Sequence, residues 1–261
     1  MKGIVLAGGR ATRLYPLTAH ISKHLLPVYD RQLIFYPLNT LISAGIRDIL
    51  VIVSAQQPAL FVDLLSGVFN DRDVNIFFRT QDKPRGLSDA FILGESFIEN
   101  DDVMLVLGDN IFEHNFFNAV THFNVGCKIF LKEVPDPRPF GVVEIKPNGK
   151  VVSIEEKPEK PKSNLIATGA YIFDSRVSML AKTLKPSKRG ELEITDLFRL
   201  YNEIDPYYLQ TEIIEGEWLD AGTPESLLEA GNIVKEKGLY KNFHPFIEEG
   251  IKRFIKKVRA T

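Results

Sequence analysis

The sequence predicts an α/β fold with a mostly parallel sheet covered by helices. Strand-like and helix-like segments alternate through the first half of the chain, which is the order expected of such a sheet. Asp48–Ser54 is a nearly continuous aliphatic run, typical of a strand that is buried on both faces. The second half changes to a hairpin pattern and is interpreted as an elaboration of the α/β half, not as an independent domain.

The elements of the first half follow from apolar runs of strand or helix length. The helix that starts at Leu33 carries apolar residues around much of its surface and is expected to end before Gly45. The expected strands are Lys2–Ala7, Asp48–Ser54, Val74–Arg79 and Val103–Leu107, and the expected helices are Leu33–Ala44, Leu60–Val68 and Leu87–Ile98.

The clearest signal in the second half is a β-hairpin. Asn148-Gly149 stands between two alternating segments, and Asn-Gly suits a tight hairpin turn. The hairpin strands are expected at Gly141–Lys146 and Val151–Glu155. The other expected elements are strands at Thr168–Phe173 and Tyr207–Glu215 and helices at Ile194–Ile204, Leu227–Lys237 and Phe246–Val258.

The last two helices have informative ends and faces. Thr223 can cap the first of them, with Pro224 as its initial residue and Gly238 at its end. The terminal helix, Phe246–Val258, has an apolar face and a basic face. Such a helix can bind a membrane surface or an acidic partner. Docking of the apolar face on the protein, with the basic face in solvent, is the favoured interpretation.

The composition is ordinary for a globular enzyme and argues against several classes. Hydrophobic residues make up 44% and charged residues 25% of the 261 residues. The net charge of −2 argues against nucleic acid binding, which needs a strong basic excess. The first residues lack a signal-peptide pattern, and no apolar run is long enough to cross a bilayer. The single cysteine, Cys127, is expected to be a buried thiol. A cytoplasmic protein without membrane or nucleic acid partners is therefore expected.

A glycine- and arginine-bearing loop follows the first strand. Gly8 and Gly9 let backbone N–H groups approach a phosphate, and Arg13 adds a fork of donors for phosphate oxygens. The loop has neither the Gly-x-Gly-x-x-Gly pattern nor a Gly-Lys-Ser/Thr sequence, which excludes the common dinucleotide and Walker motifs. Glycines after a strand are common in α/β proteins. This loop alone therefore does not favour a phosphate-binding loop over an ordinary one.

Lys23 strengthens the phosphate hypothesis. It lies among Ile21, Leu25 and Leu26, in a stretch that prolines hold extended. A lone lysine is usually a solvated surface residue, but burial of its charge requires an anionic partner. The surroundings of Lys23 therefore favour an anion site.

Asp109 follows Gly108, directly after the expected hydrophobic strand Val103–Leu107. Acidic residues at strand ends of α/β sheets face the ligand crevice, and a hard oxygen ligand suits Mg²⁺. A helix cap is the alternative interpretation of Asp109, because a helical pattern follows. A second carboxylate, Asp220, is far away in the chain, so spacing does not show whether the fold unites the two.

The loop from Leu6 to Leu14, the run Ser22–Asp30 and the acidic motifs resemble those of sugar nucleotidyltransferases. The sequence is most similar to the short-form glucose-1-phosphate thymidylyltransferases, from Lys2 to about Ile233. The resemblance implies a Rossmann-like three-layer α/β fold with an inserted β-hairpin lobe that binds the sugar. It also implies Mg²⁺ as cofactor and a homotetramer. The substrates are then dTTP or UTP and a hexose 1-phosphate, expected to be glucose 1-phosphate.

The family's site residues transfer to matching positions of this sequence. Without the resemblance, an ordinary turn is the preferred interpretation of Gly86. A surface ion pair is the alternative interpretation of Glu156 and Lys157. The resemblance implies catalytic roles for Arg13, Lys23 and Lys157 and metal binding by Asp109 and Asp220. It implies nucleotide binding by Leu6, Gly8, Gly9, Gln81, Gly86 and Asp109 and sugar-phosphate binding by Asn110, Gly141, Glu156, Lys157, Thr168, Gly169 and Tyr171. The stretch Arg189–Asp196 also matches a family signature and is given a supporting role.

Three positions depart from the family pattern. Ala11 stands where the third loop glycine is usual, with Arg10 in the variable position before it. His24 replaces a glutamine after Lys23, and Phe140 replaces a frequent tyrosine before the sugar-binding Gly141. These changes bear on which nucleotide and sugar are preferred, and the reaction class is unaffected.

The resemblance also divides the chain by role. Residues 1–240 are expected to form the nucleotidyltransferase domain, with 1–125 mainly for the nucleotide and 126–223 mainly for the sugar and metal, and 241–261 a helical extension. Two rival functions stay open. A glycosyltransferase of related fold could use Asp71-Arg72-Asp73 as a metal motif, although a solvated loop is the favoured interpretation. A non-catalytic regulator that binds nucleotide sugars is the other rival.

Overall fold

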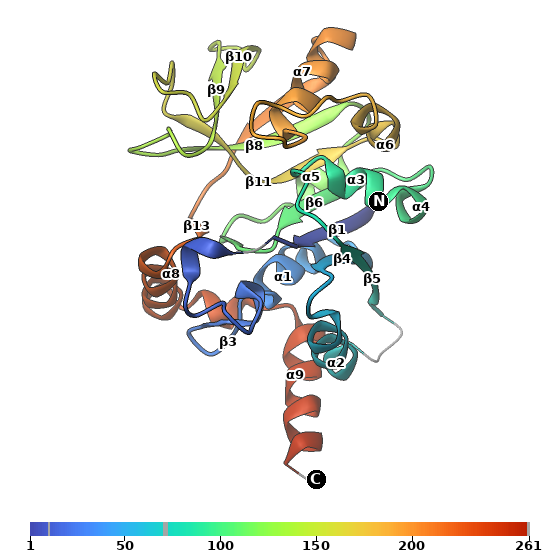
Figure 1. Ribbon diagram of the computed structural model, residues 1–261, viewed down its shortest axis with the longest axis vertical. Coiled ribbons are helices and arrows are strands. Elements are labelled where there is room, and N and C mark those ends of the chain that lie inside the picture. The colour runs from blue at the N-terminus through green and yellow to red at the C-terminus, as the bar shows by residue number, and fades with distance from the viewer. Residues whose placement is uncertain (10, 70–72, 260–261) are drawn as a thin grey trace. The chain divides into compact units, whose positions relative to one another are not determined.

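The computed structural model describes residues 1–9, 11–69 and 73–259 (Figure 1). The chain divides into two compact units, each assembled from separate stretches of sequence. The first, which we call the insert unit, consists mainly of residues 85–105 and 119–216. The second, which we call the base unit, consists of residues 2–84, 106–118 and Glu217 onward.

The base unit contains the parallel strands that the sequence predicts. β1 (Lys2–Ala7) pairs with β4 (Asp48–Ser54), and β4 pairs with β5 (Asn75–Gln81), both in parallel. β1 and β4 are almost completely buried, which explains their uninterrupted aliphatic sequences. Helix α1 (Phe35–Ser43) contacts β1, and α2 (Pro58–Val68) contacts β4 and β5. The mixed α/β class with a mainly parallel central sheet is confirmed.

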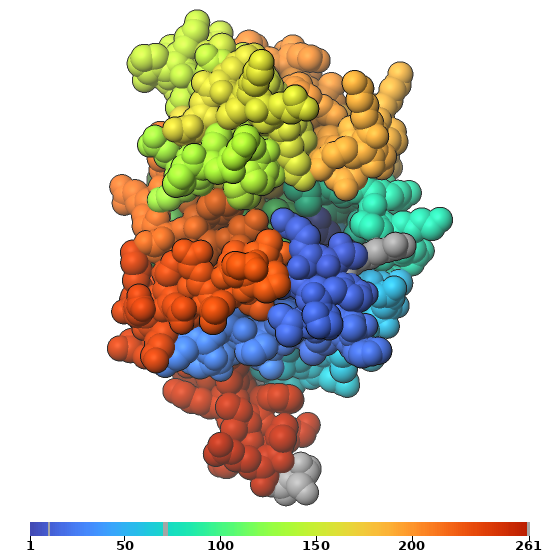
Figure 2. Space-filling model, turned by 60° about the vertical axis from the view of Figure 1, so that its left-hand side comes forward, coloured from blue at the N-terminus to red at the C-terminus, as the bar shows by residue number. Residues whose placement is uncertain are grey.

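Shorter elements complete the base unit. β2 and β3 form a small hairpin beside α8, and Figure 2 shows the orange α8 next to blue N-terminal residues. α8 has the predicted ends, with Thr223 in a capping box, Pro224 in the first turn and Gly238 in left-handed conformation at φ 68°. The bounds are β2 Pro27–Val28, β3 Arg31–Gln32, β7 Asn110–Phe112, β13 Trp218–Asp220, α8 Pro224–Lys237 and α9 Pro245–Val258, with 3-10 turns at Thr12–Leu14, Lys23–Leu25 and Leu239–Asn242.

The terminal helix α9 docks on α2 over only part of its length. The Phe254 ring lies against Gly67, where a Cβ would come within 2.4 Å of the ring, and Ile247 is fully buried. The last turns of α9 extend past α2 in Figures 1 and 2, and there Ile255 and Val258 are 43% and 57% exposed. The docked interpretation therefore holds for α9 as far as Phe254, whereas the apolar side chains of Ile255 and Val258 are exposed.

The insert unit is built around antiparallel strands and the predicted hairpin. β9 and β10 pair antiparallel, β11 pairs with β9 and β8, and β12 runs parallel to β8. Gly149 turns the hairpin at φ 80°. The bounds are α3 Asp89–Leu93, α4 Glu95–Ile98, β8 Cys127–Glu133, β9 Gly141–Ile145, β10 Val151–Glu156, β11 Leu165–Phe173, α6 Val177–Ala181, α7 Ile194–Ile204 and β12 Leu209–Ile213. β6 (Val103–Leu107) and α5 (Phe117–Thr121) each begin in one unit and end in the other.

One helix differs from its prediction. The segment Leu87–Ile98 forms two short helices, because Gly94 leaves helical geometry at φ −88° and ψ 2°. Cys127 is fully buried as expected, and burial raises the pKa of its thiol well above the usual value. Within the described part of the chain, no helix has the length and apolar character needed to span a membrane.

Candidate active site

The base unit brings Lys23 and Asp109 into direct contact. Lys23 Nζ donates a hydrogen bond to Asp109 Oδ2, and their side chains are 15% and 14% exposed. Lys23 is placed by the 3-10 turn that follows Ser22, and Asp109 by the turn after β6. The anionic partner that the sequence predicts for Lys23 is therefore this carboxylate.

The pairing of β7 with β13 brings the two predicted metal ligands together. The strands are antiparallel, with Asp220 opposite Asn110, and Ala221 N donates to Asp109 O at 3.0 Å. Asp109 and Asp220 thus lie at neighbouring positions of paired segments. The alternative interpretation of Asp109 as a helix cap is wrong, because the strand β7 follows it directly.

Arg13 joins this group through Gly222. A Cβ at Gly222 would lie 2.9 Å from Arg13 Nη2 and 3.1 Å from Asp220 Oδ1. The Arg13 guanidinium and the Asp220 carboxylate therefore both lie beside the Cα of Gly222. Arg13 as a whole is exposed. The structure unites all four predicted residues, Arg13, Lys23, Asp109 and Asp220, within one unit.

Asn110 and Trp218 hold the carboxylate of Asp109. Asn110 Nδ2 donates to Asp109 Oδ1 at 3.0 Å, and Trp218 Nε1 donates to Asn110 Oδ1 at 2.7 Å. Asn110 is only 2% exposed, so these bonds fix its amide. The predicted sugar-phosphate role of Asn110 stays a prediction, but its contacts are those of a residue that orients Asp109. The sequence analysis missed Trp218, whose signal was its position two residues before Asp220.

The protonation states follow from this arrangement. Burial raises the pKa of Asp109, but the Lys23 ammonium, together with its hydrogen bond and that of Asn110, outweighs burial and brings the pKa to about 2. Burial lowers the pKa of His24 to about 3, and the Lys23 charge acts in the same direction. Asp109 is therefore an anion and His24 a neutral imidazole at neutral pH. His24 fills the space beside Gly108, where a Cβ would meet its ring at 2.6 Å.

A cavity of about 280 Å³ lies beside the glycine loop, lined among others by Gly9, Thr12, Lys23 and Gln57. Gly9 has φ 94°, and among the described residues, its chain neighbours aside, nothing lies within 4 Å of where its Cβ would be. Ala11 has the left-handed conformation φ 47°, ψ 39°, which a glycine adopts without strain and an alanine does not. The departure at Ala11 thus falls on a position whose backbone suits the usual glycine.

Gly8 and Gln81 are packed against each other in the base unit. A Cβ on Gly8 would lie 2.6 Å from Gln81 Oε1, so the missing side chain makes room for the glutamine amide. Gln81 is the last residue of β5 and is 7% exposed. Leu6 accepts a hydrogen bond from Gly108 N at 2.9 Å. The structure thus groups Gln81 with the glycine loop, as a shared nucleotide site requires.

Gly86 belongs to the insert unit and has a structural reason to be glycine. Its φ is 104°, and a Cβ would lie 2.5 Å from both N and O of Leu192. These contacts neither need nor exclude a bound base, so its nucleotide role stays a prediction. The sequence reasoning missed Leu192 as the neighbour of this turn.

The predicted sugar residues of the insert unit gather around Glu156. Gly141 is its partner across β9 and β10, and a Cβ there would lie 3.5 Å from Glu156 Oε2. Arg189 Nη2 donates to Glu156 Oε1 at 3.2 Å, while Lys157 Nζ is 3.9 Å from the same oxygen. Burial and the nearby Glu193 raise the pKa of Glu156, against the opposing effect of the two cations. These contacts agree with the supporting role predicted for the stretch at Arg189.

The other predicted sugar residues lie on β11. Thr168 Oγ1 donates to Phe130 O at 2.8 Å, where the pairing of β11 with β8 is irregular between Ala167 and Tyr171. Gly169 is buried within the same irregular stretch. Tyr171 is 3% exposed and packs on Phe198, with ring centroids 5.2 Å apart. The Thr168 hydroxyl therefore bonds to the main chain of β8. Sugar contacts by Thr168, Gly169 and Tyr171 stay predictions.

The two carboxylates suit the kind of site that Mg²⁺ uses. This ion often takes one or two protein carboxylates and completes its shell with water and substrate phosphates. Asp109 and Asp220 supply that number of hard oxygen ligands. Among the described residues, no group of three or more His, Cys, Asp or Glu side chains could hold a metal. Arg10 and the residues Asp71 and Arg72 of the rival metal motif lie outside the described residues.

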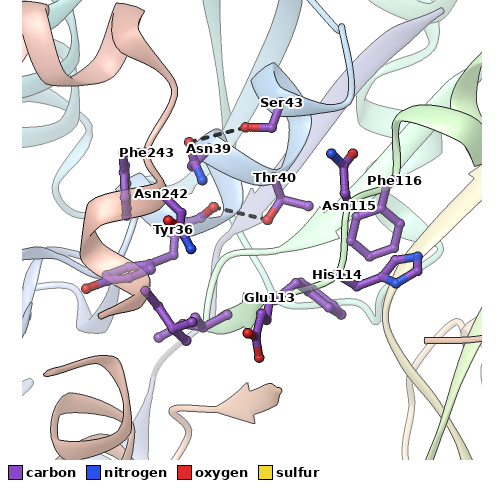
Figure 3. Close-up of a pocket in the computed structure, with 13 residues that line it drawn as sticks. Tyr36, Asn39, Thr40, Ser43, Glu113, His114, Asn115, Phe116, Asn242 and Phe243 are labelled. Atoms are coloured by element: carbon purple, nitrogen blue, oxygen red, sulfur yellow. Dashed lines mark hydrogen bonds between the residues drawn. The ribbon is translucent and has the colours of Figure 1, made fainter. Parts of the chain in front are cut away.

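A second cavity of about 160 Å³ in the base unit contains no predicted site residue. Figure 3 shows its polar side chains on α1, among them Tyr36, Asn39 and Thr40, with Glu113 and His114 opposite. Two of the hydrogen bonds drawn there, from Thr40 to Tyr36 O and from Ser43 to Asn39, lie within α1. This cavity is lined by the segment that follows β7 and is separate from the cavity at the glycine loop.

Known proteins resemble the chain over most of its length. The family model described as nucleotidyl transferase matches residues 2–237. A glucose-1-phosphate thymidylyltransferase from Neisseria meningitidis is 50% identical over 251 residues, which are 94% of this chain and 86% of the relative. One from Mycolicibacterium smegmatis is 46% identical over 241 residues, 90% of this chain and 82% of the relative. A solved Bacillus anthracis structure, assigned as a glucose-1-phosphate thymidylyltransferase, has a TM-score of 0.86 at 40% identity and covers 95% of this chain and 99% of that one.

Proposed function

The chain belongs to the nucleotidyl transferase family, and we propose that it transfers a thymidylyl group from dTTP to glucose 1-phosphate, giving dTDP-glucose and pyrophosphate. The names of the relatives support these substrates. The observation that carries the proposal is the convergence of Lys23, Asp109, Asp220 and Arg13 in the base unit, through the contacts at Asp109 and Gly222. A UTP-dependent or broader sugar-1-phosphate nucleotidyltransferase is the alternative.

In the proposed reaction, an oxygen of the sugar phosphate attacks the α-phosphorus of the triphosphate. The new P–O bond forms in line with the bond that breaks, and pyrophosphate leaves with its electrons. Because the attacking phosphate is already an anion, no general base is needed. The obstacle is the repulsion between two polyanions and the charge that develops on the phosphoryl and leaving groups.

The predicted residues would each reduce part of this charge repulsion or position a substrate. The Arg13 guanidinium would hold the departing pyrophosphate, and the Lys23 ammonium would stabilise the α-phosphoryl group. Lys157 would position the sugar phosphate, with Glu156 accepting hydrogen bonds from sugar hydroxyls. Asp109 and Asp220 would hold Mg²⁺, which when bound neutralises charge on the triphosphate and the leaving group.

The proposal keeps the division of the chain by role. Residues 1–125 would serve mainly the nucleotide, 126–223 mainly the sugar phosphate and metal, and 241–261 would form the helical extension of the domain at 1–240. A cytoplasmic location and a homotetramer are part of the proposal through the family resemblance, and both stay predictions.

A pyrophosphate-release screen tests the function. It crosses dTTP, UTP, ATP and GTP with several hexose 1-phosphates and includes a control without magnesium. We expect the highest rate with dTTP and glucose 1-phosphate and no release without the metal. Release of a nucleoside diphosphate from a nucleotide sugar when an acceptor glycan is added, without pyrophosphate release, would favour the glycosyltransferase rival. Ligand binding without any turnover would favour the regulator.

A further inference from the structure

The segment that carries Gly86 is tied to the segment that carries Glu193 by close main-chain contacts. Leu192 N donates to Arg85 O at 2.7 Å, and Ser88 N donates to Leu192 O at 3.2 Å. The Cβ position of Gly86 is filled by the Leu192 backbone. The two segments therefore pack backbone against backbone, with no room for a side chain at Gly86.

Ser88 adds a side-chain hydrogen bond to this contact. Its Oγ donates to Glu193 O at 3.0 Å, and Ser88 is fully buried. Loss of this donor would remove a hydrogen bond from the main chain of a buried residue, which is costly. The Ser88 hydroxyl thus fixes the position of the Glu193 main chain.

Glu193 is connected in turn with Glu156. Arg189 Nη2 bonds to Glu193 Oε2 at 2.7 Å and to Glu156 Oε1 at 3.2 Å. Ser187 Oγ donates to Glu193 Oε1 at 2.6 Å, and Glu193 is itself buried. A displacement of Glu193 would therefore move Arg189 and alter both the charge around Glu156 and its orientation.

From this chain of contacts we propose that Ser88 is a positioning residue that couples nucleotide binding to sugar-phosphate binding. The proposal rests on the proposed function, in which Gly86 contacts the base and Glu156 contacts the hexose. Ser88 acts through Glu193, because its hydroxyl is used on that carbonyl. Occupation of either site then orders the shared support, so each substrate raises the affinity for the other.

Calorimetry on the full chain measures this coupling. Binding of glucose 1-phosphate is titrated with and without an α,β-methylene analogue of dTTP, which cannot react. In the wild-type protein we expect the analogue to tighten binding of glucose 1-phosphate. In Ser88→Ala we expect the tightening to fall by about three- to tenfold, the range that loss of one hydrogen bond gives. KM for both substrates should rise, with kcat within about twofold of wild type.

Ser178→Ala is the matched control. Ser178 is another buried serine of the insert unit, and its Oγ has no hydrogen-bond partner within the described ranges. Its substitution should leave the coupling unchanged. The proposal is overturned if Ser88→Ala keeps the wild-type coupling between the two substrates. It is also overturned if Ser88→Ala and Ser178→Ala lose this coupling equally.

Two further results separate the possible failures. If Ser88→Ala does not fold, Ser88→Cys keeps a weaker donor, and its coupling decides: a lower value supports the role of Ser88, and an unchanged value overturns it. A wild-type protein that releases no pyrophosphate from any substrate pair contradicts the proposed function. An active wild-type protein with unchanged coupling in the variants contradicts only the role of Ser88.

Discussion

Lys23 donates a hydrogen bond to Asp109 across 86 positions of the sequence. The contact places a cation proposed to stabilise the α-phosphoryl group beside a carboxylate proposed to bind the metal. Each charge is then compensated within the protein, which keeps Asp109 ionised in spite of its burial.

Asp109→Asn should lower turnover by about 10²-fold or more, because a preorganised charge in the site is lost. Steady-state pyrophosphate release on protein with a wild-type circular dichroism spectrum measures the effect. Asp136→Asn is the control, since Asp136 is an exposed carboxylate paired with Arg138 at 2.7 Å. Near-wild-type turnover in folded Asp109→Asn would exclude the proposed role.

Trp218→Phe should raise the Mg²⁺ concentration needed for half-maximal rate by about three- to tenfold, because the indole N–H that fixes Asn110 is lost. A magnesium titration at saturating substrates measures it. Tyr207→Phe, at a position 88% exposed, should leave the titration unchanged. Superimposable curves for Trp218→Phe and wild type would mean that the bond to Asn110 does not tune the metal site.

Gly8→Ala should raise KM for the nucleotide by about three- to tenfold, since the new methyl would displace the Gln81 amide. KM for the sugar phosphate should change little. Gly231→Ala in helix α8 is a suitable comparison. Outside the backbone of α8, its Cβ would meet only Tyr29 N among the described residues, at the ordinary contact distance of 3.6 Å. Unchanged nucleotide KM in Gly8→Ala would argue that Gln81 does not bind the base.

Asp174→Asn should lower the free energy of unfolding at pH 7 by about 2 kcal/mol, because a buried carboxylate accepts charge-assisted bonds. Its Oδ2 accepts from Gly126 N at 2.7 Å and Arg176 Nη2 at 2.6 Å, and its Oδ1 accepts from Tyr201 OH at 2.9 Å. Burial raises the pKa of Asp174, but these donors outweigh it and lower the pKa. Burial and then the charge of Asp174 raise the pKa of the nearby Asp102, so the two carboxylates disfavour each other's ionised form.

The sign of the pH dependence follows from that lowered pKa. The stability from Asp174 is present above its unfolded pKa, near 3.8, and is lost as the pH falls through the lower folded value. Denaturant unfolding between pH 7 and pH 2 measures this effect. The free energy of unfolding should fall less on acidification in Asp174→Asn than in wild type. Parallel curves for the two proteins would contradict this role.

Buried strands were the most predictable part of the fold. Lys2–Ala7, Asp48–Ser54 and Val103–Leu107 have the bounds that their aliphatic runs predict, because burial on both faces leaves a continuous apolar signal. The helix at Leu87–Ile98 was less predictable, since its apolar spacing continues through Gly94 while the backbone turns there. The low helix propensity and the backbone angles of Gly94 therefore divide the predicted helix into two.

Candidate site residues could be named from the sequence, but the way in which the fold brings them together could not be predicted. β7 and β13 have three residues each, too few for a periodic signal, and only their register places Asp220 opposite Asn110. The sequence predicted a turn or a nucleotide contact at Gly86. The group packed against it, the main chain of Leu192, is more than a hundred positions away and leaves no mark in the sequence pattern.

The β7–β13 pair also has a consequence for synthesis on the ribosome. Asp109 emerges early, whereas Asp220 and the strand that aligns it follow only after residues 119–216, the larger part of the insert unit. Closing so long a loop is slow and entropically unfavourable until its contacts form. A nascent chain therefore lacks the pair of carboxylates until β13 has been synthesised, so the site that we propose for nucleotide chemistry is complete only near the end of translation.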